Sequence, residues 1–126
     1  MLANKRPIYL NLFKIRLPIT GMVSLAHRAS GVLLFLAIPL AAYLLELSVT
    51  SRDGFDYVMN ILQQPALKLL MLALVWGLAH HLFAGIRFLL IDADIGVEKS
   101  SARFGAWLVI GAELMVVAGF VFGAWL

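Results

Sequence analysis

Three long apolar runs constrain this chain more than any other feature of its sequence. They extend over about residues 21–47, 66–91 and 104–126. A helix needs about 20 residues to cross the hydrocarbon core of a bilayer, and each run is long enough. Backbone N–H and C=O groups find no water in lipid, so a spanning segment must satisfy them within its own helix. The sequence therefore predicts an all-α integral membrane protein with three transmembrane helices.

The composition supports the same fold class. The 126-residue chain is 63% hydrophobic and 13% charged, whereas soluble domains are about 45–50% apolar and about 25% charged. A soluble protein of this size has too much surface for its volume to bury so many apolar side chains. We expect residues 1–126 to form a single transmembrane anchor domain. Because the chain has no cysteine, it cannot form disulfides or bind an iron–sulfur cluster through thiolates.

Local signals predict where the helices begin and what connects them. Thr20 is a predicted N-cap for the first helix, and Pro65 fits the first turn of the second. Ser100 or Ser101 is predicted to cap the third helix. Residues 48–64 are predicted to form a short polar loop.

Basic residues are distributed unevenly among the ends of the runs. The N-terminal side carries Lys5, Arg6, Lys14 and Arg16, and the second loop carries Lys99 and Arg103. The first loop has only Arg52. The positive-inside rule therefore predicts a cytoplasmic N-terminus and a C-terminus on the other side. Basic and apolar residues alternate over residues 6–17, so this segment is expected to lie in the membrane interface rather than to bind nucleic acid.

One face of the first run carries polar groups with complementary chemistry. Ser24, His27, Arg28 and Gly31 follow the i, i+3, i+4, i+7 spacing of one helical face. A guanidinium with hydrogen-bonding neighbours suits carboxylates such as haem propionates, and a hydroxyl with a guanidinium suits the carbonyls of a quinone. In the alternative interpretation Arg28 binds lipid phosphate and His27 packs against another helix. The spacing alone leaves both open.

The second run carries a histidine between two glycines. Gly77, His81 and Gly85 lie on one stripe at intervals of four residues. Such a groove could hold a flat macrocycle with the imidazole reaching its iron. Alternatively, the stripe is a helix-packing groove with a hydrogen-bonded histidine. His80 is offset by about 100° and is expected to point elsewhere.

Other ionisable or small residues lie within the spans. Arg87 is expected to extend its side chain toward the cytoplasmic surface. Glu113 lies near the middle of the third run, where it is expected to be protonated or paired with a partner subunit. Gly119 and Gly123 have small-xxx-small spacing, which predicts close packing.

Two motifs together resemble a known family. Residues 24–31 read Ser-Leu-Ala-His-Arg-Ala-Ser-Gly, and residues 81–87 read His-x-x-x-Gly-Ile-Arg. The pair is similar to the signature of the cytochrome b anchor subunit of succinate dehydrogenase, and the resemblance extends over essentially the whole chain. Many members have a histidine after the second motif, where this chain has Phe88.

The resemblance implies roles for particular residues. By position, Ser24 and Arg28 correspond to quinone-binding residues. His27 and Arg28 correspond to contacts with the haem propionates, and His81 corresponds to an axial ligand of the haem iron. No catalytic residue and no dicarboxylate or flavin site is implied on this chain.

The resemblance also implies a cellular setting. The chain would be a membrane anchor of succinate:quinone oxidoreductase in a bacterial inner membrane, with its C-terminus periplasmic. It would bind haem b together with a second small membrane anchor subunit, and an iron–sulfur subunit and a flavoprotein would lie on the cytoplasmic side. Electrons would pass to ubiquinone. The alternatives are a fumarate reductase anchor working in reverse, a small proton-coupled transporter with Glu113 as relay, and a scaffold without cofactor.

Overall fold

The computed structural model describes residues 16–125, with side chains described as far as Gly123. It contains the helices α1 (Ile19–Thr50), α2 (Arg52–Leu62), α3 (Pro65–Asp92) and α4 (Lys99–Trp125). Helices α1, α3 and α4 are each long and apolar enough to cross a membrane. The all-α fold with three membrane helices is therefore confirmed. The predicted interfacial segment lies outside the described residues except for Arg16 and Leu17, which are exposed.

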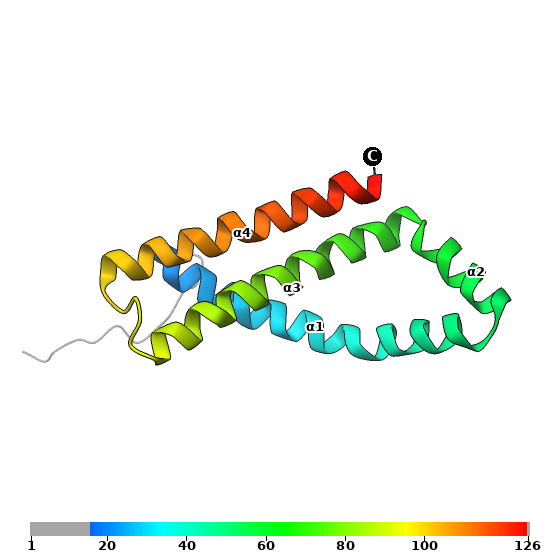
Figure 1. The fold of residues 1–126 in the computed structure, drawn as a ribbon, viewed down its shortest axis with the longest axis horizontal. Coiled ribbons are helices and arrows are strands. Elements are labelled where there is room, and N and C mark those ends of the chain that lie inside the picture. The colour runs from blue at the N-terminus through cyan, green and yellow to red at the C-terminus, as the bar shows by residue number, and fades with distance from the viewer. Residues whose placement is uncertain (1–15, 126) are drawn as a thin grey trace, which may run out of the picture.

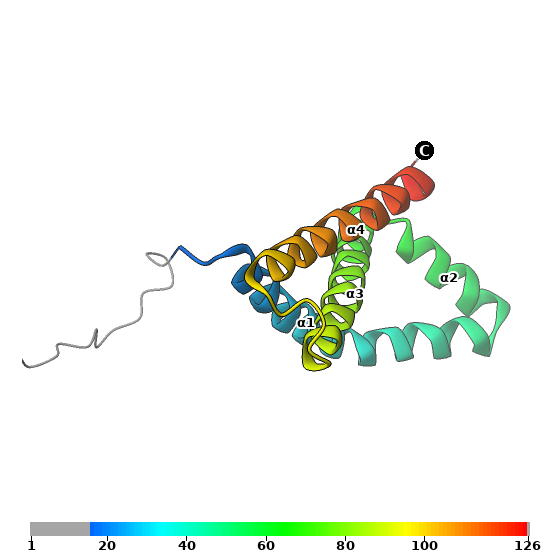
Figure 2. The ribbon, with the colours of Figure 1, turned by 60° about the vertical axis from the view of Figure 1, so that its left-hand side comes forward.

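Helix α3 lies at the centre of the bundle. It runs antiparallel to α1 on one side and to α4 on the other (Figure 1). The start of α1 and the loop between α3 and α4 share one end of the molecule, and α2 lies at the opposite end together with the end of α4 (Figures 1 and 2). The two sequence motifs, on α1 and α3, therefore lie on adjacent helices.

The helix starts differ in part from the predicted caps. Helix α1 begins at Ile19 with Pro18 at the N-cap, and the Pro18 carbonyl accepts from the N–H of Gly21 at 2.9 Å. Thr20 therefore lies inside the first turn, and the predicted cap is wrong. Proline lacks an N–H and has a helix-compatible φ, so the helix starts directly after it. Pro65 is the first residue of α3, as predicted.

The predicted polar loop over residues 48–64 is wrong, because α1 continues to Thr50 and α2 fills most of the remainder. Ser51 caps α2 by accepting a hydrogen bond from the Gly54 N–H at 3.0 Å. A Cβ at Gly54 would overlap the Leu47 carbonyl oxygen, so glycine allows α2 to turn back closely onto α1.

The core is small and lies where the three membrane helices meet. It is formed by Val23 of α1, Ala84 of α3, and Ala106 and Val109 of α4. Most large apolar side chains point outward instead, as Phe35 does with 71% of its surface exposed. This distribution suits a chain whose surroundings are lipid and other membrane helices.

Candidate functional site

His27 and His81 bring the two motifs together. Their rings stack with centroids 4.1 Å apart and planes 8° from parallel. Helix α1 approaches closely here, because a Cβ at Gly31 would lie only 3.1 Å from Cε1 of His81. Small residues on α1 thus place the His81 ring directly against the backbone of the first motif.

One nitrogen of His81 is held by the first motif. Nδ1 lies 3.2 Å from the carbonyl oxygen of His27 and 3.3 Å from Oγ of Ser30. Ser30 is fully buried and donates from Oγ to the same carbonyl at 2.9 Å. A carbonyl can only accept, so this geometry assigns the proton of a neutral His81 to Nδ1. Nε2 then carries the lone pair that a metal ligand needs.

His27 has its own environment beside the same contact. Its Nε2 is buried without a hydrogen-bond partner in residues 16–125. A Cβ at Gly85 would lie 3.5 Å from this nitrogen, and the Phe88 ring packs edge-on at 5.2 Å. A buried polar atom without a partner costs free energy, so a bound group that hydrogen-bonds His27 would stabilise the site.

Ser24 and Arg28 lie one turn apart on α1, where Ser24 is half-buried and Arg28 is exposed. Leu25 is 54% exposed, and Leu78 and Leu82 beside His81 on α3 are 60% and 54% exposed. The structure therefore joins His27 to His81 but leaves Ser24 and Arg28 on a face that residues 16–125 do not close by themselves.

The glycine stripe of α3 takes part in helix packing. A Cβ at Gly77 would lie 3.1 Å from Cδ2 of Leu33, and one at Gly85 would lie against His27. Side chains of α1 thus occupy the groove at both glycines. Of the two interpretations of the stripe, this arrangement supports helix packing, because close approach of α1 uses the space that the glycines leave. His81 between them remains positioned by α1.

His80 faces away from His81, as its angular offset predicts. It is 2% exposed, with Nδ1 bonded to the Glu113 carboxyl on α4 and Nε2 3.2 Å from the Val23 carbonyl oxygen on α1. Glu113 is therefore paired within the chain rather than with a partner subunit. Sequence reasoning missed this pair, although both residues lie about 20 Å along their helices from the α3–α4 loop at 1.5 Å per residue.

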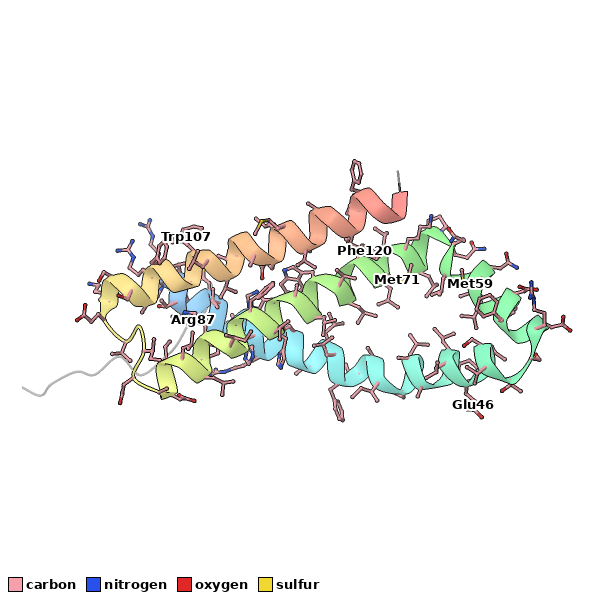
Figure 3. The ribbon with its side chains drawn as sticks, in the orientation of Figure 1. Glu46, Met59, Met71, Arg87, Trp107 and Phe120 are labelled. Carbon is pink, nitrogen blue, oxygen red and sulfur yellow. The ribbon has the colours of Figure 1, made fainter. Side chains whose placement is uncertain are left out.

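Arg87 is buried rather than extended toward the surface, so that prediction is wrong. It is 8% exposed, and its Nη2 donates to the Ala102 carbonyl on α4 at 3.0 Å. Gly105 makes room for it, since a Cβ there would lie 3.5 Å from Nε. Figure 3 shows Arg87 at the end of the bundle where Trp107 lies, opposite the end that carries Glu46 and Met59.

Comparison with known proteins identifies the family of this chain. Residues 3–120 match the family model described as succinate dehydrogenase/fumarate reductase transmembrane subunit. The succinate dehydrogenase cytochrome b556 subunit of Coxiella burnetii is 32% identical over 123 residues, which cover 97% of each chain. That of Paracoccus denitrificans is 32% identical over 122 residues, covering 93% of this chain and 94% of the relative. The chain therefore belongs to the succinate dehydrogenase/fumarate reductase transmembrane subunit family, and it is a membrane subunit of the succinate dehydrogenase complex.

Proposed function

We propose that this chain binds haem b through Nε2 of His81 and helps to form the quinone-reduction site of succinate:quinone oxidoreductase. The observation that carries the proposal is the contact of His81 Nδ1 with the His27 carbonyl at 3.2 Å. Histidine ligands of metals usually donate their other N–H to such an acceptor, which fixes the tautomer and the ring. The relatives are named cytochrome b556 subunits, which agrees with a b-type haem.

The second axial ligand would come from another subunit. His27 is engaged in its stack with the His81 ring. His80 is held by Glu113 and by the Val23 carbonyl. The open face around Ser24 and Arg28 also fits a site that a second small membrane anchor subunit completes.

Open space on α4 provides further surface for such a partner. A Cβ added at Gly119 or at Gly123 would meet no atom of the described chain within 4 Å. The predicted packing of these glycines is therefore not made within residues 16–125. Small residues allow close approach of another membrane helix.

Haem b supplies one-electron transfer when it is bound. Arg28 and His27 would hold its propionates, because a guanidinium and an imidazole N–H both donate to carboxylate oxygens. The buried Nε2 of His27, unpaired in residues 16–125, agrees with such a role.

Ser24 and Arg28 would bind ubiquinone. A quinone carbonyl only accepts hydrogen bonds, and the Ser24 hydroxyl can donate one without adding charge. The Arg28 guanidinium would stabilise the negative charge that develops on the quinone oxygen as it is reduced. Both residues lie on a side of α1 that the described chain leaves open, where a quinone can enter from the bilayer.

The remaining subunits would lie on one side of the membrane. Excess Lys and Arg at the N-terminus and in the α3–α4 loop supports a cytoplasmic location for both, with the C-terminus in the periplasm. The iron–sulfur subunit would dock on this cytoplasmic face, with the flavoprotein beyond it. Whether the complex works in reverse, as a fumarate reductase, depends on the reduction potential of the quinone. The family assignment argues against the alternative of a proton-coupled transporter.

A visible spectrum of the purified, intact complex tests the proposal. We expect sharp b-type absorption bands after reduction with dithionite. A complex that contains this chain, oxidises succinate with a soluble acceptor and shows no b-type bands would contradict haem binding. That outcome would favour the scaffold alternative.

A further inference from the structure

Arg87 places a positive charge inside the membrane bundle without a carboxylate partner in residues 16–125. Its guanidinium is buried, bonds one backbone carbonyl through Nη2 and leaves Nε without a partner in the same range. The two salt bridges of the described chain join Arg52 to Asp56 and His80 to Glu113. A charge in a membrane span is costly unless an opposite charge or a polar group compensates it.

An apolar groove lies beside this guanidinium, in the seam between α3 and α4. It has a volume of about 230 Å³, and Arg87 is the only charged residue among the described ones that line it. Its walls include Ile86 and Leu90 from α3 and Leu108 and Ala112 from α4. Because α3 and α4 are antiparallel (Figure 1), the groove follows the direction in which acyl chains lie in a bilayer.

The position of Arg87 along α3 completes an amphiphilic site. Arg87 lies five residues before the end of α3 at Asp92, which is about 8 Å at 1.5 Å per residue. Its guanidinium bonds the Ala102 carbonyl, close to the start of α4 at Lys99, so the charge lies near the same end of the bundle. Lys99 and Arg103, both exposed, begin α4 at the same end and add attraction for an anionic headgroup.

We infer that the α3–α4 groove binds an anionic phospholipid. The phosphate accepts hydrogen bonds from the Arg87 guanidinium, and one acyl chain lies along the apolar walls. A planar guanidinium matches phosphate oxygens in charge and geometry, and basic pockets between membrane helices bind such headgroups. A neutral amphiphile would fill the groove without compensating the charge. This site uses none of the proposed haem or quinone residues and does not depend on their roles.

Lipid titration of the intact, delipidated complex tests the inference, with bound lipids counted by native mass spectrometry. The probe is phosphatidylglycerol, and zwitterionic phosphatidylcholine of the same chain length is the comparison. Arg87→Gln should weaken binding of one phosphatidylglycerol about fivefold or more. Arg52→Gln is the matched control, because it removes an exposed charge at the opposite end of the bundle, and it should retain that lipid.

A second variant tests the groove itself. Ala112→Phe fills the groove away from Arg87 and should also displace the lipid, whereas glycerol phosphate, a headgroup without chains, should not compete. Equal phosphatidylglycerol affinity in wild type and Arg87→Gln would overturn the inference, as would equal affinity for the two lipids. Equal phosphatidylglycerol affinity in wild type and Arg87→Gln is also expected if a carboxylate of another subunit neutralises Arg87. If Arg87→Gln does not assemble, retention of the lipid by Ala112→Phe overturns the inference.

Discussion

The imidazole of His81 contacts His27 twice: the His27 ring stacks on it with centroids 4.1 Å apart, and the His27 carbonyl oxygen lies 3.2 Å from its Nδ1. One residue of the first motif thus sets both the plane and the tautomer of the histidine in the second motif. A metal ligand held in this way loses less rotational freedom on binding than a freely rotating side chain. The two motifs therefore act as one structural unit.

We predict that His81→Ala abolishes the b-type spectrum of the assembled complex, because it removes the proposed iron ligand. His80→Ala should retain the bands, since His80 faces Glu113 and Val23. The measurement is the dithionite-reduced spectrum normalised to protein. The opposite result in the two variants would show that the ligand is His80.

Gly31→Ala should perturb haem binding without removing the ligand. The added Cβ would lie 3.1 Å from Cε1 of His81, so the ring must move by a few tenths of an ångström. We expect a lower haem content or a shifted spectrum, and a larger effect from Gly31→Val. Gly111→Ala is the control, because a Cβ there meets nothing of the described chain within 4 Å. Identical haem content and spectra in Gly31→Val and Gly111→Ala would contradict the proposed position of the ligand.

Ser24→Ala and Arg28→Ala should lower succinate–quinone activity strongly, because each removes a donor to the quinone. Loss of one such donor typically costs about 10²–10³ in rate. Electron transfer from succinate to a soluble artificial acceptor should be spared, since the flavin and clusters are proposed to lie on other subunits. Arg28→Ala should also shift the haem spectrum through the propionates. A wild-type ratio of the two activities in both variants would place the quinone site elsewhere.

Glu113→Ala should destabilise the helix bundle, because it leaves the buried His80 without its partner on α4. Loss of one partner of a buried hydrogen bond costs about 1–3 kcal/mol. The double variant His80→Leu with Glu113→Leu should be more stable than the sum of its single variants predicts. Thermal unfolding of the complex measures this, with the exposed Glu46→Gln as control. Strictly additive effects would show that the pair is not coupled.

Reporter fusions test the orientation. Excess basic residues at the N-terminus and in the α3–α4 loop predict a periplasmic reporter after Gln63 and at Leu126, and a cytoplasmic one after Glu98. A cytoplasmic reporter at Leu126 would contradict the proposed topology and the docking side of the iron–sulfur subunit.

The number of membrane helices and the family could both be predicted from the amino-acid sequence. A membrane helix satisfies its backbone hydrogen bonds internally, so local length and apolarity are sufficient to predict it. The sequence does not predict helix α2, because this helix is short and mixed in polarity. Gly54 is needed for its close approach to α1, which is a tertiary contact. The sequence motifs also predict His81 as the candidate ligand.

The contacts between side chains of different helices depend on tertiary packing and could not be predicted from the sequence. The fold pairs His80 with Glu113, lays α1 over Gly77 and Gly85, and packs Arg87 across α4. Each of these contacts joins residues from separate helices, and helical periodicity says which residues share a face but not what that face meets. Their partners depend on how the three helices pack together, which no single segment encodes.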